Sequence, residues 1–559
     1  MDSIINPYKG ARATFPFELN GNYHISGFNS FNVGNSMGYR DAFVLKSNNY
    51  GDSIISKTDF NNHNKDLRCQ EIYNIKSNLY IFGSYYDSIV EYSNLFLTIL
   101  DTNYIEISRK YIVFDTITSG VDSGVVLNFI PSRVKLLKDS TFLILGRCYN
   151  PGNYHKPMYF KLDTLGNIIW NKKIEEPISG QFHAAFGDAV ELPDNSIVFS
   201  GYKNFEYCNF HNSDIWIAKA DKFGNLLWDV NWYSPPQLSN YESALSIAYD
   251  EIENSLAIST VRNQIPYLFK IDTSGAFYYN FDNPTYEDNS TILGSFSSII
   301  NTHDGNFLAI GYRKKQSNNN NSEAFIVKYN NYGSFLWKRK FIGFNNGHVN
   351  FTNGIATSDG GFLLTGSADT PIYTLNFRKV SAYVVKTNCL GFTGPPQAQM
   401  QCSGTGLNYT FTNLSERADS CYLDFGDGSP VLVIRAEHDT FPINHTYAAQ
   451  GNYQITLIAT ACGEADTMVC SFNTSTGALY DAEDAISVFP NPASQHLTIK
   501  SSSILKNISI YNAFGALVYK EKVENTNTKI INVETLKSGV YFIEVEDDLR
   551  SKIEKVIKN

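Results

Sequence analysis

The stretch FLILGRCYNPGNYHKPMYFKLDTLGNIIW at 142–170 contains the unit from which most of this chain is built. An apolar segment ending in Gly146 is followed by a variable loop and by a second apolar segment with a Lys near its end. A tight turn, DTLG, and Trp170 complete the unit. The second segment alternates apolar and polar residues over a few positions, which is typical of a half-buried strand. The unit therefore predicts antiparallel strands joined by short turns.

The same unit occurs seven times between Gly21 and Gly391. The first strand of each copy ends at position 27, 83, 146, 201, 260, 311 or 366, so the copies lie 51 to 63 residues apart. A period of about 55 residues is typical of a four-stranded propeller blade. The last copy lacks a fourth strand, and residues 1–10 are similar to residues 51–60, which form the fourth strand of the first copy. We therefore predict an all-β protein with a seven-bladed β-propeller over 1–393, closed by the N-terminal strand.

Large aromatic residues follow the tight turns at a constant distance. Each stands four residues after a turn glycine: Trp170, Trp228, Tyr279 and Trp337. Large aromatics at one register of an outer strand are most simply explained by packing between neighbouring blades, with ligand stacking as the alternative. The same turns open with Asp163, Asp221 and Asp272, whose carboxylates we expect to bond their own backbone.

Composition excludes several classes of function. The 559-residue chain carries a formal charge of −10 and has no long basic run, which argues against nucleic acid or an anionic membrane as its main partner. No apolar run is long enough for a membrane-spanning helix, so no transmembrane segment is expected. No leader is visible before the first predicted strand, and we expect a signal peptide upstream in the natural precursor.

Cysteine usage points to an oxidising compartment. Four of the eight cysteines lie between 402 and 470, and no pair has the CxxC spacing of a zinc site. Four cysteines allow three pairings. The strand order expected for this region favours Cys421 with Cys462 and Cys402 with Cys470.

After Pro395-Pro396 the pattern changes to short strands. FGDG at 425–428, HTY at 445–447, and Gly451 with Tyr453 opening an alternating strand resemble a polycystic-kidney-disease-type (PKD) domain over 396–475. The resemblance implies an immunoglobulin-like sandwich that serves as a spacer or a weak glycan or protein binder. Asp424 and Asp427 raise calcium as an alternative. Because a tight turn already explains both carboxylates, no metal or cofactor is expected.

A short acidic linker at 476–486 precedes a second run of alternating strands. Residues 487–559 closely resemble the type A C-terminal sorting domain of the bacterial type IX secretion system. The resemblance rests on Pro490, Asn491, Pro492, Gly515, Gly539, Tyr541, Lys552 and Lys555. It implies a small β-sandwich that the outer-membrane translocon reads, and hence a secreted or outer-membrane surface protein. From the strand pattern alone, a carbohydrate-binding module is the alternative.

No catalytic motif is found, so we predict no catalytic residue and no enzyme. HExxH, P-loop and dinucleotide fingerprints are absent, and the ten histidines are scattered. Propeller function usually resides in loops at one end of the channel. The variable loops predict four ligand-binding residues: Tyr154, Tyr202, Tyr207 and Tyr312.

These observations predict a non-catalytic secreted or cell-surface binding protein, such as an adhesin, with a glycan or protein ligand. Two alternatives stay open. One is an extracellular enzyme acting on polysaccharide or peptide. Clustered carboxylates in the channel, or a His with an Arg there, would favour this alternative. The other is a structural spacer of the cell surface.

Overall fold

The computed structural model describes residues 2–5, 11–30, 40–48, 53–60, 65–87, 92–112, 128–149, 155–174, 183–204, 213–232, 242–262, 265–282, 293–314, 322–343, 347–372, 377–435, 442–474, 478–480, 486–512, 516–548 and 551–558. Within these ranges the regular secondary structure consists of β-strands alone, as predicted. No helix in the described part of the chain is long and apolar enough to cross a membrane. The chain divides into two compact units, Met1–Gly394 and Pro395–Asn559.

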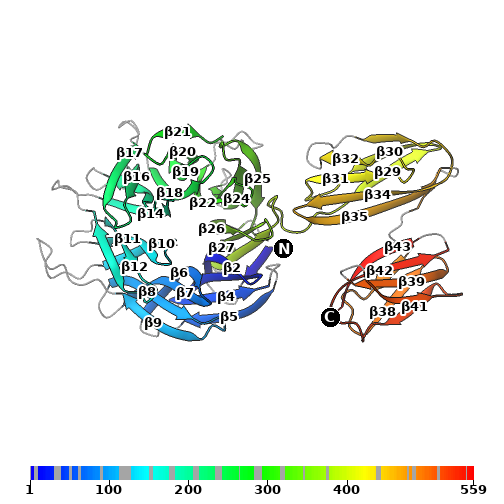
Figure 1. Ribbon diagram of the computed structural model, residues 1–559, viewed down its shortest axis with the longest axis horizontal. Helices are drawn as coiled ribbons and strands as arrows, with labels where there is room; N and C mark the ends of the chain where they lie inside the picture. The colour runs from blue at the N-terminus through cyan, green and yellow to red at the C-terminus, as the bar shows by residue number, and fades with distance from the viewer. Residues whose placement is uncertain are drawn as a thin grey trace, which may run out of the picture. The chain divides into compact units, whose positions relative to one another are not determined.

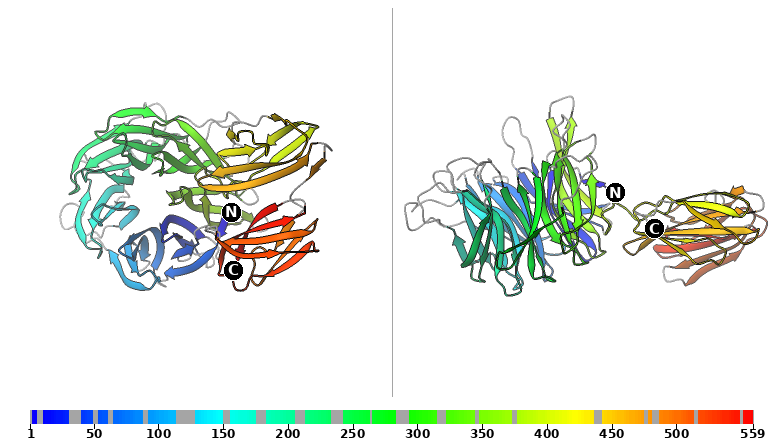
Figure 2. Two further views of the ribbon diagram at one scale, coloured as in Figure 1. Left: turned by 45° about the vertical axis from the view of Figure 1, so that its right-hand side comes forward. Right: turned by 90° about the horizontal axis from the view of Figure 1, so that it is seen from above.

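The first unit is a propeller-like ring of four-stranded antiparallel sheets (Figures 1 and 2). The described residues form seven such sheets, numbered here in chain order, with the innermost strand first. Sheet 1 contains β2 (Ala11–Leu19), β3 (Asn22–Ser30), β4 (Arg40–Ser47) and β5 (Ile54–Phe60), and sheet 2 contains β6 (Lys65–Ile75), β7 (Asn78–Asp87), β8 (Tyr92–Leu100) and β9 (Glu106–Ile112). Sheet 3 contains β10 (Asn128–Leu136), β11 (Phe142–Tyr149), β12 (His155–Leu162) and β13 (Ile168–Lys173), and sheet 4 contains β14 (His183–Glu191), β15 (Ile197–Asn204), β16 (Asp214–Ala220) and β17 (Leu226–Trp232).

The remaining three sheets continue the same order. Sheet 5 contains β18 (Glu242–Asp250), β19 (Ser255–Arg262), β20 (Ile265–Asp272) and β21 (Phe277–Asn280), and sheet 6 contains β22 (Leu293–Asn301), β23 (Phe307–Lys314), β24 (Ser322–Tyr329) and β25 (Phe335–Phe341). Sheet 7 contains β26 (Val349–Ala356), β27 (Phe362–Ile372), β28 (Phe377–Thr387) and, as its outermost strand, β1 (Asp2–Ile5). β1 pairs antiparallel with β28, from Asp2 opposite Val385 to Ile5 opposite Ala382. The first and last strands of the ring therefore share one sheet.

The antiparallel order gives the ring two different ends. The turns between the first and second strands and between the third and fourth strands lie at one end, which we call the tight-turn end. The connections between the second and third strands and between successive sheets lie at the other, the loop end. The loops that differ most among the sequence repeats therefore all leave from the loop end.

Neighbouring sheets are joined by buried aromatic and aliphatic side chains. Between sheets 3 and 4, for example, one core contains Tyr159, Phe186 and Trp216. The turn glycine Gly224 has φ +80°, and a Cβ built on it would lie 2.8 Å from the ring of Trp170 in the preceding sheet. The repeated aromatics thus pack against the turn of the next sheet, which confirms the packing interpretation for Trp170.

A second repeated contact joins strands within a single sheet at the tight-turn end. In five sheets, a Lys of the third strand forms an ion pair with an acidic residue in, or directly before, the turn between the first two strands. The pairs are Lys161–Asp139 at 2.6 Å, Lys219–Asp194 at 3.6 Å, Lys270–Asp250 at 2.5 Å, Lys328–Asp304 at 2.5 Å and Lys386–Asp359 at 2.7 Å. The Lys in the sequence repeat is therefore part of the scaffold.

The second unit contains two pairs of antiparallel sheets, each pair with its own core. The first pair consists of β29 (Met400–Thr405), β30 (Asn408–Asn413) and β33 (Ile443–Thr446), and of β32 (Leu432–Arg435), β31 (Ser420–Asp424), β34 (Asn452–Ala461), β35 (Glu464–Asn473) and β36 (Ala478–Tyr480). The second pair consists of β37 (Ile486–Phe489), β38 (His496–Ser501) and β41 (Thr528–Asn532), and of β40 (Leu517–Lys522), β39 (Leu505–Asn512), β42 (Gly539–Asp547) and β43 (Ser551–Lys558).

The predicted cysteine pairs are wrong. Cys462 is in a disulfide, as is Cys389, whereas Cys402, Cys421 and Cys470 are thiols. Cys421 is buried in the core, directly opposite Ala459 in the pairing of β31 with β34. Cys462 lies beyond the end of β34, in the turn to β35, with φ 57°. The strand register therefore keeps these two side chains apart, which strand order alone did not reveal.

Candidate functional site

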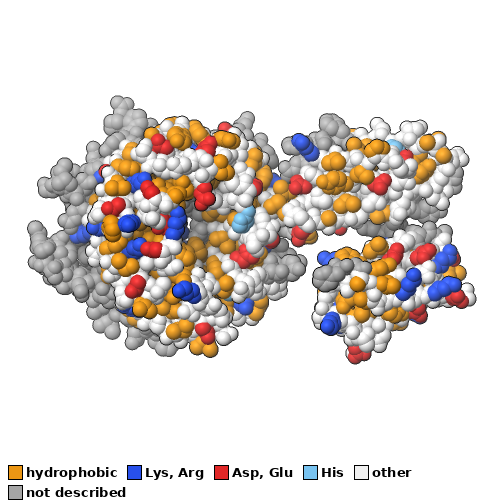
Figure 3. Space-filling view, in the orientation of Figure 1, with side chains coloured by type: hydrophobic (Ala, Val, Ile, Leu, Met, Phe, Trp, Pro, Cys, Tyr) orange, Lys and Arg blue, Asp and Glu red, His pale blue; other side chains and the backbone are white. Residues whose placement is uncertain are grey.

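The innermost strands of all seven sheets share an irregularity at the same place. In each, one extra residue forms a β-bulge opposite the interior of the second strand. The residues that follow the bulge form what we call the belt: Phe15, Glu71, Arg133, Asp188, Ser246, Ser298 and Asn353. Bulges re-aim side chains and often accompany functional sites. Because the inner strands surround the centre of the ring, where Figure 3 shows a hollow, the belt is the candidate site.

Side chains of the bulged residues connect successive sheets. Thr14 Oγ1 donates to the Cys69 carbonyl at 3.0 Å, and Gln70 Nε2 donates to the Pro131 carbonyl at 2.9 Å. Ser132 Oγ donates to the Phe186 carbonyl at 2.8 Å. In each case the acceptor is the residue just before the bulge of the next sheet. The bulges therefore fix the spacing and register of the inner strands from sheet 1 to sheet 4.

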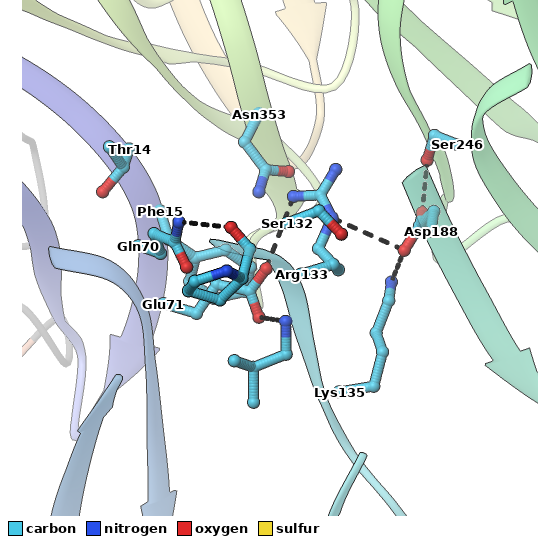
Figure 4. A network of polar contacts seen from close by, with 12 residues as sticks. Thr14, Phe15, Gln70, Glu71, Ser132, Arg133, Lys135, Asp188, Ser246 and Asn353 are labelled. Carbon is cyan, nitrogen blue, oxygen red and sulfur yellow. Dashed lines mark hydrogen bonds and ion pairs between the residues drawn. The ribbon is translucent and has the colours of Figure 1, made fainter. Parts of the chain in front are cut away.

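Three belt residues from consecutive sheets form an ionic group (Figure 4). Arg133 lies between two carboxylates, with its NH1 3.5 Å from Glu71 Oε1 and its Nε 3.5 Å from Asp188 Oδ1. Lys135 Nζ lies 2.7 Å from the same Asp188 oxygen, and Ser246 Oγ donates to Asp188 Oδ2 at 2.7 Å. The group spans sheets 2 to 5.

The two carboxylates have different environments although each is only 2% exposed. Burial raises the pKa of Glu71 to about 7, against the opposing effects of Arg133, Lys135 and the Tyr73 hydroxyl. Burial acts in the same direction on Asp188, but the charges of Lys135 and Arg133 outweigh it and hold its pKa below the usual range. At neutral pH, Asp188 is therefore ionised, and Glu71 is only partly so.

The carboxylates also differ in their hydrogen bonds. Glu71 Oε2 accepts hydrogen bonds from the Tyr73 hydroxyl at 2.9 Å and from the Val134 backbone N–H at 2.8 Å. In Figure 4 the Asn353 amide and the Arg133 guanidinium point into the same space at the centre of the ring. The belt thus combines one cation, two carboxylates and an amide around a common centre.

Sequence reasoning missed this group, although the sequence holds a signal for it. Glu71, Arg133 and Asp188 stand 12, 13 and 13 residues before the repeated glycines Gly83, Gly146 and Gly201 of the second strands. Other repeats have uncharged residues at this register. A charged residue at this one register in three repeats marks the belt, but the bulge that turns it inward cannot be seen in the sequence.

Of the four predicted ligand-binding tyrosines, Tyr154 and Tyr207 lie outside the described residues. Tyr202 and Tyr312 occupy equivalent positions of β15 and β23, directly after the glycine of the second strand, and both are partly exposed. The Arg147 guanidinium of sheet 3 lies 3.3 Å from the Tyr202 hydroxyl of sheet 4. The two tyrosines stay predictions as ligand-binding residues.

The sorting-signal residues Asn491, Lys552 and Lys555 each take part in contacts of β43. Asn491 Nδ2 donates to the Lys555 carbonyl at 2.8 Å, and its Oδ1 accepts from Ile557 N at 2.9 Å, so this side chain covers part of the edge of β43. Lys552 Nζ donates to the Ile486 carbonyl at 2.8 Å. Pro490 and Pro492 flank Asn491, Gly539 and Tyr541 lie in β42, and Gly515 lies outside the described residues.

The carboxylates considered for calcium are occupied within the domain. Asp424 Oδ1 accepts from Gly426 N at 2.9 Å. Asp427 Oδ1 accepts from Ser429 N at 3.0 Å, and its Oδ2 lies 2.7 Å from His445 Nε2. Among the residues whose placement is described, no three His, Cys, Asp or Glu side chains are grouped as metal ligands would be.

Comparisons with known proteins identify both C-terminal regions. A family model described as a secretion system C-terminal sorting domain matches residues 487–559, and a PKD domain model matches residues 392–469. Both resemblances seen in the sequence are thus confirmed. No curated protein sequence matches the chain.

Among solved structures, a polysaccharide lyase of family PL25, an ulvan lyase, has 9% identity, covers 69% of this chain and 94% of its own, and has a TM-score of 0.42. The β-propeller domain of the trilobed protease from Pyrococcus furiosus has 9% identity, 68% and 94% coverage, and a TM-score of 0.37. The acylaminoacyl peptidase from Pyrococcus horikoshii has 9% identity and a TM-score of 0.38; the match covers 72% of this chain but only 57% of the peptidase. At this identity, none of these activities is transferred to the chain.

Proposed function

We propose that this chain is a non-catalytic binding protein, exported by the type IX secretion system to the cell surface or the medium, whose ring holds an extracellular glycan or protein ligand. In this proposal the seven sheets are the blades of a seven-bladed β-propeller, and the two pairs of C-terminal sheets are immunoglobulin-like sandwiches. The sorting domain at 487–559 supports export.

One observation carries the binding proposal: the side chains that repeat along the ring take part in scaffold contacts. The repeated Lys residues pair with turn carboxylates, as Lys328 does with Asp304, and the repeated Trp residues cover a turn of the next sheet, as Trp170 covers Gly224. The residues that differ among repeats lie in the belt and at the loop end. Repeated side chains form the scaffold, and the residues that differ between repeats are left for recognition. This arrangement is expected of a binding ring.

Binding to arrays tests this proposal with the full-length protein. We expect saturable binding to a glycan or an extracellular protein, weakened by Tyr202→Ala and Tyr312→Ala. Tyr278→Ala is the matched control, because Tyr278 is 46% exposed on the outer strand β21. An absence of saturable binding on both arrays would favour a spacer, and equal losses in all three variants would remove the role given to the loop end.

A second candidate, an enzyme acting on polysaccharide or peptide, is favoured by the clustered carboxylates Glu71 and Asp188 on either side of Arg133. Two carboxyl groups whose pKa values are pushed apart form the usual pattern of an acid and base pair. Their burial opposes this reading, because a catalytic acid must reach the substrate. Turnover of any glycan or peptide by the wild type, lost in Glu71→Gln, would establish the enzyme and overturn the binding proposal.

Export is tested separately. Removal of residues 487–559 is expected to keep the protein from the cell surface and the medium. A milder variant, Asn491→Ala, removes both side-chain hydrogen bonds to β43 and is expected to lower the exported fraction. Unchanged export of the truncated chain would contradict the role given to this domain.

A further inference from the structure

We infer that the belt binds the carboxylate of an acidic saccharide, with the Arg133 guanidinium as the group that recognises it. This inference deepens the proposed function, on which it rests, by naming a ligand class and a place in the ring. The protein itself uses few of the N–H donors of the Arg133 guanidinium.

Arg133 has contacts with two carboxylates, but both are long. A guanidinium carries five N–H donors, and good charge-assisted hydrogen bonds are about 2.7–2.9 Å long. The two Arg133 ion pairs measure 3.5 Å, and its buried Nε has no hydrogen-bond partner among the described residues. Arg133 is therefore positioned by Glu71 and Asp188 without being fully bonded to either.

The short contacts of both carboxylates go to other groups. Asp188 is bonded to Lys135 at 2.7 Å and to Ser246 at 2.7 Å, and Glu71 is bonded to Tyr73 and to the Val134 N–H. These contacts hold the carboxylates back, at the wall of the ring. The Arg133 side chain, 17% exposed, is then the polar group that can meet an incoming oxyanion. A carboxylate matches the guanidinium fork in a bidentate pair.

The charge balance also favours an anion. Arg133 and Lys135 are cationic, Asp188 is ionised, and Glu71 is partly protonated at neutral pH because burial raises its pKa to about 7. The group thus carries a net positive charge until Glu71 loses its proton. Such a charge within low-dielectric walls attracts a counter-ion more strongly than an exposed one does.

The rest of the belt favours a saccharide over a peptide as the carrier of this carboxylate. Ser298 and Asn353 supply a hydroxyl and an amide at the same level of the ring, and such groups pair with sugar hydroxyls. Phe15 is the one apolar residue among the seven belt positions, and the other six are charged or polar, so the belt offers little apolar surface to peptide side chains.

Titration calorimetry of the full-length protein with D-glucuronate tests the inference, with D-glucose as the uncharged control. We expect saturable glucuronate binding and at least tenfold weaker glucose binding. Arg133→Met should weaken glucuronate binding by about tenfold or more, the usual loss for one desolvated charge-assisted pair. Arg133→Lys, which keeps the charge but loses the fork, disturbs the fold less and should still weaken it several-fold.

Arg109→Met is the matched control. Arg109 is also 17% exposed and pairs with Glu106, but it lies on the outer strand β9. Its loss should leave glucuronate binding unchanged. Two results would overturn the inference. One is an equal loss of glucuronate affinity in Arg109→Met and Arg133→Met. The other is an Arg133→Lys variant that binds glucuronate as tightly as the wild type does. N-acetylglutamate is the peptide-like probe, and tighter binding of it than of glucuronate would overturn the saccharide assignment.

A pH series gives a readout that a structural role would not produce. Wild-type affinity should fall by about tenfold from pH 6 to pH 8 as Glu71 ionises beside the ligand. The charged or titratable groups that face Glu71 are Cys69, Tyr73, Arg133, Lys135 and Asp188. Burial raises the pKa of Cys69 to about 12 and that of Tyr73 well above 10, and the pKa of Asp188 is low, so none of these three titrates in the window.

Glu71→Gln should bind glucuronate with the same affinity at pH 6 and pH 8. A wild-type affinity that does not change with pH, or a variant that keeps the full change, would overturn the assignment to this group. The proposed function has a separate outcome. Array binding that depends on Tyr202 and Tyr312, without any glucuronate binding, would leave the binding role intact and remove only the acidic ligand.

Discussion

Two parts of the same ring use ionic contacts in opposite ways. At the tight-turn end, a Lys and an acidic residue of one sheet form an ion pair in five sheets, and in four of them the pair is 2.5–2.7 Å long, as for Lys386 with Asp359 at 2.7 Å. In the belt, Arg133 bridges carboxylates from two other sheets at 3.5 Å, and this group occurs once. The backbone repeats at both places, but the side chains repeat only where they hold the scaffold together. Contacts that close within a repeat stabilise it, and contacts that differ between repeats are where recognition is expected.

The largest effect should come from breaking the most buried scaffold pair. Lys270 is fully buried, and its Nζ lies 2.5 Å from Asp250 and 2.5 Å from Glu253. Lys270→Met leaves Asp250, 3% exposed, without its cation, and should lower the free energy of unfolding by about 3–5 kcal/mol. Urea unfolding followed by tryptophan fluorescence measures this in the full chain, because all five Trp residues lie in the ring.

Lys161→Met is the control, because Lys161 occupies the equivalent position in sheet 3. Its partner Asp139 is 52% exposed, so the loss should be about 1 kcal/mol or less. Equal losses at both positions would mean that burial does not distinguish the pairs, and the repeated contact would then stabilise each sheet to the same extent.

The next effect concerns the belt and its dependence on pH. The pKa of Glu71 is raised from an ordinary 4.5 to about 7 by burial. A raised carboxyl pKa means that the folded state binds the proton more tightly than the unfolded state. The associated stability is therefore present in full below pH 4.5 and is lost as the pH rises through 7. The loss amounts to about 3 kcal/mol.

Glu71→Gln should not show this loss of stability. The unfolding free energy of the variant minus that of the wild type should therefore rise between pH 5 and pH 8. The comparison with wild type is needed because His24 acts with the opposite sign. Burial lowers the pKa of His24 to about 4, so its stability contribution is lost as the pH falls from 6.5. Parallel pH profiles for the two proteins would show that Glu71 does not titrate differently on folding.

The contrast between scaffold and belt also marks what the sequence can reveal. Periodicity, turn glycines and the aromatic register predicted an all-β ring, and the motifs at 425–428 and 490–492 predicted the PKD and sorting domains, because these features depend on local spacing. The pairing of Cys421 with Cys462 failed because it depends on strand register. The belt was missed because a one-residue bulge decides which side chain faces the centre.

A smaller effect is expected where neighbouring sheets approach most closely. Gly224 has φ +80°, and an added Cβ would lie 2.8 Å from Trp170. Gly224→Ala should cost about 1–2 kcal/mol from the left-handed backbone, and more if the indole cannot move. Gly428→Ala is the control, because Gly428 has a similar φ of +82° but no atom within 4 Å of the added Cβ. Since Gly428 lies outside the ring, Gly428→Ala should leave the unfolding transition seen by tryptophan fluorescence unchanged. If Gly224→Ala also leaves that transition unchanged, the packing role given to Trp170 is wrong.

The smallest effect belongs to the bulges that hold the belt in register. Ser132 Oγ donates to the Phe186 carbonyl of the next sheet, and Ser132→Ala should lower the unfolding free energy by about 1 kcal/mol. Ser297 occupies the same bulge position in sheet 6 and makes no hydrogen bond among the described residues, so Ser297→Ala should change stability little. If the Ser132 bond positions Arg133 as well, Ser132→Ala should also weaken glucuronate binding. A loss of stability without a loss of glucuronate binding would show that the bulge residues belong to the scaffold alone. Recognition would then depend on the belt residues, each of which follows a bulge.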